Sequence, residues 1–277
     1  MFCLRKEILV CLIACLFLIF GIQAWATTQN ITAKSLELPS TCGWSGTFKL
    51  IKCDYKHYYT KRNLFGLGLG VAVSSIFANS DLDQNIANWY QKSVRSHTTN
   101  ALSNLLTPLG PQIFPLYIGT ALIGGAMVRA HKSGTLYTWS MDTIRSFVVG
   151  VPPALLLQAS LGPTRPSSPS PHSDWKWFHG NENVGLSGHA FAGAIPFLVA
   201  ADMSENNVVR YGLYFASTLV GLARINDNQH YFSQVFLGWW VANSAVKVVM
   251  QPNHRQKVLI SPMLIPNGVG LCFSIKT

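Results

Sequence analysis

The chain has 277 residues, enough for one large domain or two small ones, and 49% of them are apolar. Only 12% are charged, about half the share of roughly a quarter that is usual in soluble domains, which argues against a disordered or strongly solvated chain. The net charge of +10 is scattered among apolar runs, which argues against a nucleic-acid partner and suits anionic lipid head groups or phosphorylated substrates.

The first 26 residues have the organisation of an export signal. Arg5 and Lys6 precede the apolar run of residues 8–22, and the small-x-small triplet of residues 24–26 supplies a cleavage site. An uncleaved anchor helix is the alternative, because the run is long for a signal peptide. In either case residue 27 emerges outside the cytoplasm. In that oxidising setting Cys42 and Cys53, eleven residues apart, are expected to form a disulfide.

Residues 27–110 form an exported N-terminal region in which helices are expected. Residues 64–78 are apolar, interrupted by glycines, and barely long enough to span a bilayer. Ser80 is a typical helix N-cap, and the apolar spacing after it predicts a helix through Val94. Asp81 and Asp83 fit the first turn of that helix better than they fit a metal site.

Residues 111–250 form the expected helical core, and residues 251–277 form a tail. The tail alternates apolar and polar residues around Pro266-Asn267-Gly268, which is typical of a β-hairpin. The pattern predicts an all-α fold, a bundle of about five or six core helices with the active site at one end. The expected core helices cover residues 112–128, 135–161, 187–201, 208–223 and 231–250.

Three short stretches place Arg, His and small residues at the ends of these apolar helices. Each residue alone has an ordinary structural explanation, such as a helix end, a cap or a snorkelling side chain. Their joint order and spacing are hard to obtain by chance. The stretches are Gln158 with Arg165 and Pro166, then Ser187-Gly188-His189, and then Arg224, His230 and Gln234.

The chemistry of these residues suits a phosphate group. The guanidinium groups of Arg165 and Arg224 can each donate two hydrogen bonds to a tetrahedral oxyanion. The backbone N–H groups of Ser187 and Gly188 lie at the start of an expected helix, where an anion is favoured. Two histidines are then available for covalent and acid–base steps. Together they predict a phosphoryl-transfer site that requires no metal.

The three stretches resemble the signature of the type 2 phosphatidic acid phosphatase and vanadium haloperoxidase superfamily, which is Lys-x6-Arg-Pro, Pro-Ser-Gly-His and Ser-Arg-x5-His-x3-Asp. The resemblance covers about residues 112–250. It implies that His230 attacks phosphorus and carries the phosphoryl group, and that His189 protonates the leaving oxygen and later activates water. The phosphate pocket that it implies consists of Gln158, Arg165, Ser187, Gly188 and Arg224.

Two positions depart from this signature. Gln158 stands where the family has Lys, which removes a positive charge but keeps an amide donor. Gln234 stands where the family has the Asp that orients the nucleophile. Its amide oxygen can accept the Nδ1–H of His230, but it cannot stabilise an imidazolium. Asp227, in the same loop, is a candidate for the missing charge.

The sequence therefore predicts a metal-independent phosphatase that hydrolyses a phosphate monoester or a lipid (pyro)phosphate through a phosphohistidine. No cofactor and no nucleic-acid partner are expected, and vanadate is expected to bind as a phosphate mimic. Two alternatives stay open. One is a weak or inactive phosphate-binding protein of the same fold, and the other is a vanadium-dependent haloperoxidase, which Gln158 disfavours because such enzymes use the Lys to polarise peroxide.

The order of the apolar helices also predicts a location. With residue 27 outside and five spans after residue 111, all three motifs fall on the external face, and two of the three internal connections are basic. We therefore expect a protein of the cytoplasmic membrane whose active site faces the periplasm. A soluble periplasmic protein without spans is the alternative.

Overall fold

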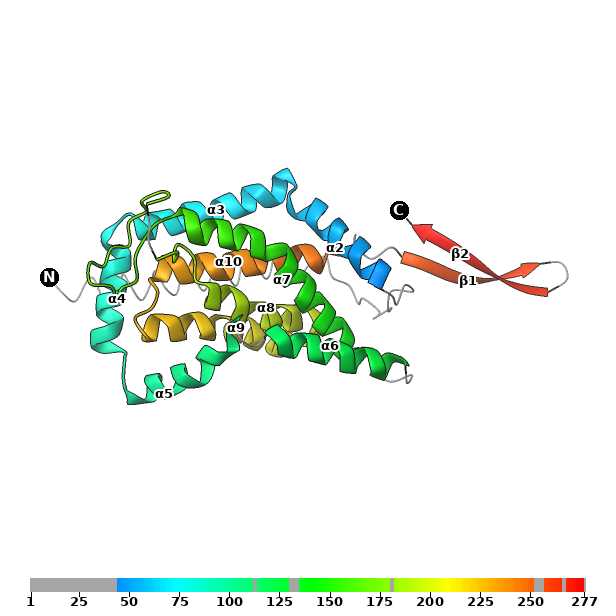
Figure 1. Ribbon diagram of the computed structural model, residues 1–277. Helices are drawn as coiled ribbons and strands as arrows, with labels where there is room; N and C mark the ends of the chain where they lie inside the picture. Colours follow the sequence, from blue (N-terminus) through cyan, green and yellow to red (C-terminus); the bar gives the residue numbers. More distant parts are fainter. Residues whose placement is uncertain are drawn as a thin grey trace. The chain divides into compact units, whose positions relative to one another are not determined.

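The computed structural model of the protein describes residues 44–111, 114–129, 135–179, 182–251, 257–265 and 268–276. Residues 1–43, which include the predicted export signal and Cys42, lie outside the described part. The described residues form helices and one hairpin (Figure 1). The elements are α2 (Trp44–Tyr58), α3 (Lys61–Ala78), α4 (Asp81–Ser93), α5 (His97–Leu106), the 3-10 helix η1 (Thr107–Leu109), α6 (Phe114–Arg129), α7 (Thr135–Ser160), α8 (Gly188–Met203), α9 (Asn207–Asn226), α10 (Phe232–Val249), β1 (Lys257–Ile265) and β2 (Gly268–Lys276).

Helix α10 is the centre of the bundle and packs against α3, α7, α8 and α9. Glycines let these helices approach closely. A Cβ at Gly193 on α8 would lie 2.6 Å from the side chain of Val220 on α9. A Cβ at Gly238 on α10 would lie 2.5 Å from the carbonyl oxygen of Ser187, so only glycine lets the start of α8 rest on α10. The predicted all-α fold is confirmed, and α6 to α10 match the five expected core helices to within three residues.

The helices of the N-terminal region pack against this core. Helix α3 lies against α10, α5 lies against α9, and α4 contacts both α9 and α10. A buried ion group ties α2 to α7, because Arg145 donates hydrogen bonds to both carboxylate oxygens of Asp54, at 2.8 and 2.7 Å, and one of 2.7 Å to Asp142. Removing one partner of a buried ion group is strongly destabilising. The helices before and after residue 110 thus share one packed core.

Helix α4 begins where the sequence predicts. The hydroxyl of Ser80 accepts a hydrogen bond from the N–H of Leu82, and Asp81 and Asp83 lie in the first turn. No three His, Cys, Asp or Glu side chains in the described part of the chain are placed to hold a metal ion. Asp83 is instead buried against the start of α10, where it accepts the N–H of Ser233 at 3.0 Å.

The tail strands pair antiparallel, with Lys257 opposite Lys276 and Ile265 opposite Gly268. Cys53 on α2 forms no disulfide with another cysteine of the described residues, and its Sγ lies 3.6 Å from Nδ1 of His57. Because Cys42 lies outside the described residues, the disulfide between Cys42 and Cys53 stays a prediction.

Membrane spans were expected from the sequence at five of the core helices. Taken singly, no described helix combines the length and the apolar composition that a span requires. Helices α3 and α4 meet this criterion only as a pair, with a bend of 70° between them.

Candidate active site

His230 lies in the turn between α9 and α10, at the end of the bundle where α8 also begins. Its side chain is buried, with 5% of the residue exposed. Its Nδ1 lies 2.8 Å from Oε1 of Gln234, one helical turn further along the chain. The structure therefore brings together the two residues that the sequence assigns to the nucleophile and its orienting partner.

Backbone groups fix the orientation of the Gln234 amide. Oε1 accepts the N–H of Tyr231 at 3.1 Å, and Nε2 donates to the carbonyl oxygen of Thr164 at 3.1 Å. With Oε1 facing His230, Nδ1 of the imidazole must carry the proton, and the lone pair is on Nε2. A carboxylate at this position could not donate to Thr164, so this hydrogen bond depends on the amide.

Burial determines the charge of His230. It lowers the pKa of His230 to about 3; the hydrogen bond to Gln234 raises this pKa, and the positive charges of Arg165 and Arg224 and the neighbouring His189 lower it further. The imidazole is therefore neutral at all pH values well above 3, and neutral imidazole is the nucleophilic form.

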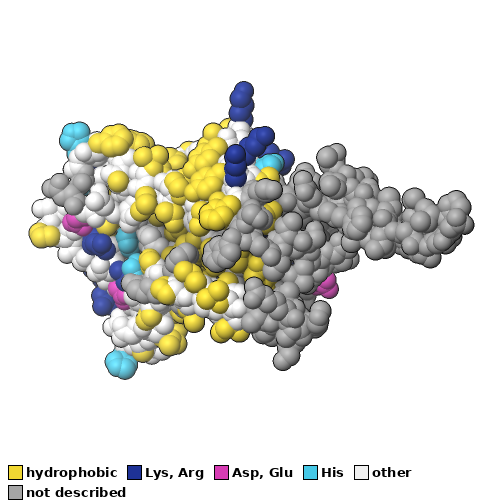
Figure 2. Space-filling model, turned by 45° about the vertical axis from the view of Figure 1, so that its right-hand side comes forward, with side chains coloured by type: hydrophobic (Ala, Val, Ile, Leu, Met, Phe, Trp, Pro, Cys, Tyr) yellow, Lys and Arg dark blue, Asp and Glu magenta, His cyan; other side chains and the backbone are white. Residues whose placement is uncertain are grey.

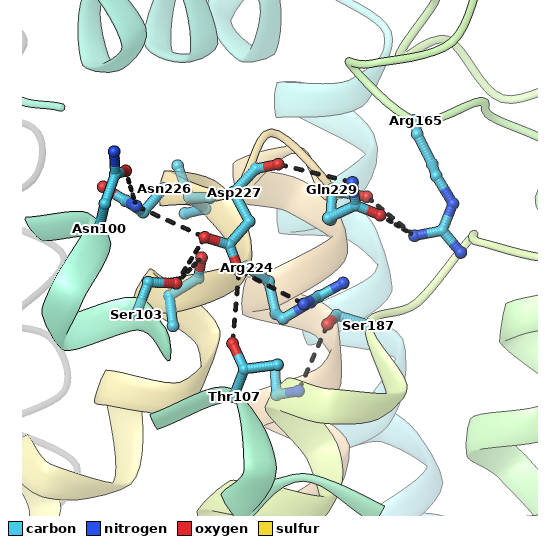
Figure 3. A network of polar contacts seen from close by, with 12 residues as sticks. Asn100, Ser103, Thr107, Arg165, Ser187, Arg224, Asn226, Asp227 and Gln229 are labelled. Carbon is cyan, nitrogen blue, oxygen red and sulfur yellow. Dashed lines mark hydrogen bonds and ion pairs between the residues drawn. The ribbon is translucent and has the colours of Figure 1, made fainter. Parts of the chain in front are cut away.

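Two arginines from different parts of the chain lie in this site (Figure 3). Arg165, in the loop after α7, donates from Nη1 to Oε1 of Gln229 at 2.9 Å and places Nε 3.7 Å from Glu182. Arg224, near the end of α9, places Nη1 3.5 Å from Oδ2 of Asp227. Its Nε is buried and has no hydrogen-bond partner in the described part of the chain, and burial lowers the pKa of this guanidinium. A buried N–H donor of this kind gains most from an anion.

The start of α8 supplies part of the predicted phosphate pocket. Ser187 is the N-cap, and its hydroxyl accepts the N–H of Ala190 at 3.3 Å. Its own N–H donates to the carbonyl oxygen of Gln234 at 2.9 Å, and the assignment of Ser187 to the phosphate pocket stays a prediction. Gly188 leaves its face of the helix open. The nearest atom to the place where a Cβ would lie is Nε2 of Gln158, at 3.7 Å.

His189 follows on the same turn of α8 and is partly buried. Burial lowers its pKa to about 4, and the charges of Arg224 and Arg165 add to this effect. His189, His230 and the two arginines are thus electrostatic neighbours. Two neutral imidazoles beside two guanidinium groups form a site that can bind a tetrahedral anion and move a proton next to it.

Comparison with known families agrees with this geometry. Residues 139–257 match the family model of the PAP2 superfamily. This segment, 119 of the 277 residues, is similar to that superfamily. The match supports a phosphatase-type activity on phosphate esters, and the matched segment contains all the motif residues from Gln158 to Gln234. The comparisons with curated proteins and with solved structures found no match.

Several residues of this site were not predicted from the sequence. Thr164 and Gln229 hold Gln234 and Arg165 through bonds that no motif encodes. Asp227 was a candidate for the negative charge that Gln234 lacks beside His230. In the structure its carboxylate bonds instead to Arg224 and to hydroxyl groups of α5 and η1. The spacing of three residues between Arg224 and Asp227 at a helix end was the signal that could have shown this pair.

Proposed function

We propose that the chain is a phosphatase that hydrolyses a phosphate monoester or a lipid (pyro)phosphate through a phosphohistidine at His230, without a required metal ion. The observation that carries the proposal is the buried, neutral His230 whose Nδ1–H is fixed by Gln234. It supplies a nucleophilic Nε2 beside two arginines that suit the phosphoryl oxygens.

In the first step Nε2 of His230 attacks phosphorus. The bond between phosphorus and the ester oxygen breaks, and protonated His189 gives that oxygen a proton and becomes neutral, so that an alcohol and a phosphohistidine form. In the second step water attacks phosphorus and gives a proton to neutral His189. The electron pair of the phosphorus–nitrogen bond returns to Nε2, which releases inorganic phosphate and restores both histidines.

Exposed apolar side chains favour a lipid phosphate over a soluble sugar phosphate. Figure 2 shows such side chains spread over much of one face, and large exposed apolar areas commonly mark contact with a membrane or another apolar partner. With the export signal, they favour action at the outer side of the cytoplasmic membrane. The exposed residues include Phe65 and Ile76 on α3, Leu122 and Ile123 on α6, Leu155 and Leu156 on α7, Trp177 and Phe178 in the following loop, and Val208 and Phe215 on α9.

Phosphate release tests this proposal. We expect the purified chain to release phosphate from phosphatidic acid, from a polyprenyl pyrophosphate or from nitrophenyl phosphate, at a rate that EDTA does not change and vanadate lowers. An absolute need for a divalent metal would contradict the histidine mechanism. Tight vanadate binding without hydrolysis would instead identify a phosphate-binding protein, the alternative that the uncharged Gln158 and Gln234 keep open.

Gln234→Asp is expected to move the pH–rate profile. A carboxylate favours the charged imidazolium, so the pKa of His230 rises from about 3 and the acid limb of kcat/KM moves to higher pH. At pH 7 turnover should rise about tenfold or more, because an aspartate in this position stabilises the developing cation. Gln251→Asp adds the same charge at an exposed position after α10 and serves as the control. An unchanged acid limb would show that His230 is not the titrating nucleophile.

A further inference from the structure

The turn that carries His230 is held by helices that lie outside the segment matched to the PAP2 family. Helices α4 and α5 and the short helix η1 come before residue 110, and each contacts α9 or α10. Polar side chains make many of these contacts. Gln91 donates to the carbonyl oxygen of Ile225 at 2.9 Å, and Asn100 accepts from the amide of Asn226 at 2.9 Å.

Asp227 is the centre of this network (Figure 3). Its Oδ1 accepts the hydroxyl of Ser103 on α5 at 2.6 Å, and its Oδ2 accepts the hydroxyl of Thr107 on η1 at 3.3 Å. The same Oδ2 lies 3.5 Å from Nη1 of Arg224. Both carboxylate oxygens are therefore fixed by residues more than 100 positions away, and the arginine is held by a carboxylate that cannot turn away.

This arrangement determines which donors Arg224 presents. Only 12% of its side chain is exposed, so the guanidinium has little freedom once Nη1 is directed to Asp227. The other edge of the guanidinium, away from Asp227, consists of Nε and Nη2. Its Nε is buried and has no hydrogen-bond partner in the described part of the chain. That edge can form paired hydrogen bonds to two oxygens of a phosphate.

We propose, on the basis of the phosphatase function above, that Asp227 is a positioning residue that orients Arg224 for the phosphoryl group, and that Ser103 and Thr107 hold Asp227 in place. The N-terminal helices are thereby part of the phosphate site. Ser103 and Thr107 do not touch the substrate, and their effect passes through Arg224.

A double-mutant cycle separates this role from a general contribution to folding. Calorimetric titration with inorganic phosphate measures the dissociation constant for wild type, Ser103→Ala, Arg224→Ala and the double variant. We expect Ser103→Ala to weaken phosphate binding about tenfold, which is about 1.4 kcal/mol, and to have almost no effect when Arg224 is already Ala. Coupling of this kind appears only between residues that act through one another.

Thr107→Val provides a second variant that keeps the size of the side chain, and a weakening of about threefold with the same dependence on Arg224 is expected. Thr218→Val is the matched control, because the Thr218 hydroxyl lies on α9 but bonds only within that helix, to Phe215. The proposal would be overturned if Ser103→Ala and Thr107→Val each weakened phosphate binding equally in wild type and in Arg224→Ala. It would also be overturned if neither variant changed phosphate binding in wild type.

Binding is measured without turnover, so the two proposals can fail separately. A chain that binds phosphate and shows the expected coupling but hydrolyses no ester supports the positioning role and contradicts the phosphatase function. An active enzyme in which the variants do not couple overturns the positioning role alone. A chain that does not bind phosphate at all overturns both.

Discussion

His230→Ala is expected to abolish turnover, with a loss of roughly four to six orders of magnitude, the range found when a covalent nucleophile is removed. The reason is that His230 is buried and neutral, is hydrogen-bonded through Nδ1 to Gln234, and is close enough to the two arginines for their charges to lower its pKa. The variant should also form no phosphoenzyme. Rapid mixing with a radiolabelled phosphate ester, followed by an alkaline quench that preserves phosphorus–nitrogen bonds, measures both effects.

Loss of folding could mimic this result, because His230 is buried. His230→Asn keeps a hydrogen-bond donor near the position of Nδ1 and should be equally inactive while it retains the wild-type melting temperature. His179→Ala removes an exposed histidine of the loop after α7 and should leave the rate unchanged. A phosphoenzyme that still forms in His230→Asn would show that another group is the nucleophile.

The sequence alone was sufficient to predict those helices and side-chain pairs that depend on local spacing along the chain. The cap at Ser80 and the apolar periodicity located α4 and the core helices. The interval of four residues between His230, in the turn before α10, and Gln234, in the first turn of α10, indicated that the two side chains could meet. Such features depend on neighbours along the chain, so they can be read before the fold is known.

The contacts that complete the site depend on packing and could not be read in this way. Thr164 and Gln234 meet across 70 residues, and Ser103 and Asp227 meet across 124. Asp83 was assigned only to its own helix, but it accepts an N–H of α10 from 150 residues away. Apolar composition was also ambiguous, because 10 of the 16 residues of α8 are buried within the bundle, and a buried core helix has the same composition as a membrane span.

The pKa of His189 gives the site an acidic working range. His189 must be protonated to donate to the leaving oxygen, and with a pKa of about 4 in the free protein it loses this proton as the pH rises above 4. His230 becomes protonated only as the pH falls through about 3. The profile of kcat/KM should therefore peak at acidic pH. A bound phosphate offsets the arginine charges that help to lower the His189 pKa, so the basic limb of kcat should lie at higher pH than that of kcat/KM.

His189→Ala should consequently depend on the leaving group. General acid catalysis contributes about two to four orders of magnitude, and this loss is expected in full for an alkyl phosphate, whose leaving oxygen needs the proton. For nitrophenyl phosphate the loss should be less than about tenfold, because a nitrophenolate leaves readily without a proton, and the basic limb of the profile should disappear. His97→Ala, at an exposed position in the first turn of α5, is the control. Equal losses on both substrates would mean that His189 binds the phosphate and does not protonate the leaving oxygen, since a lost binding contact weakens both reactions alike.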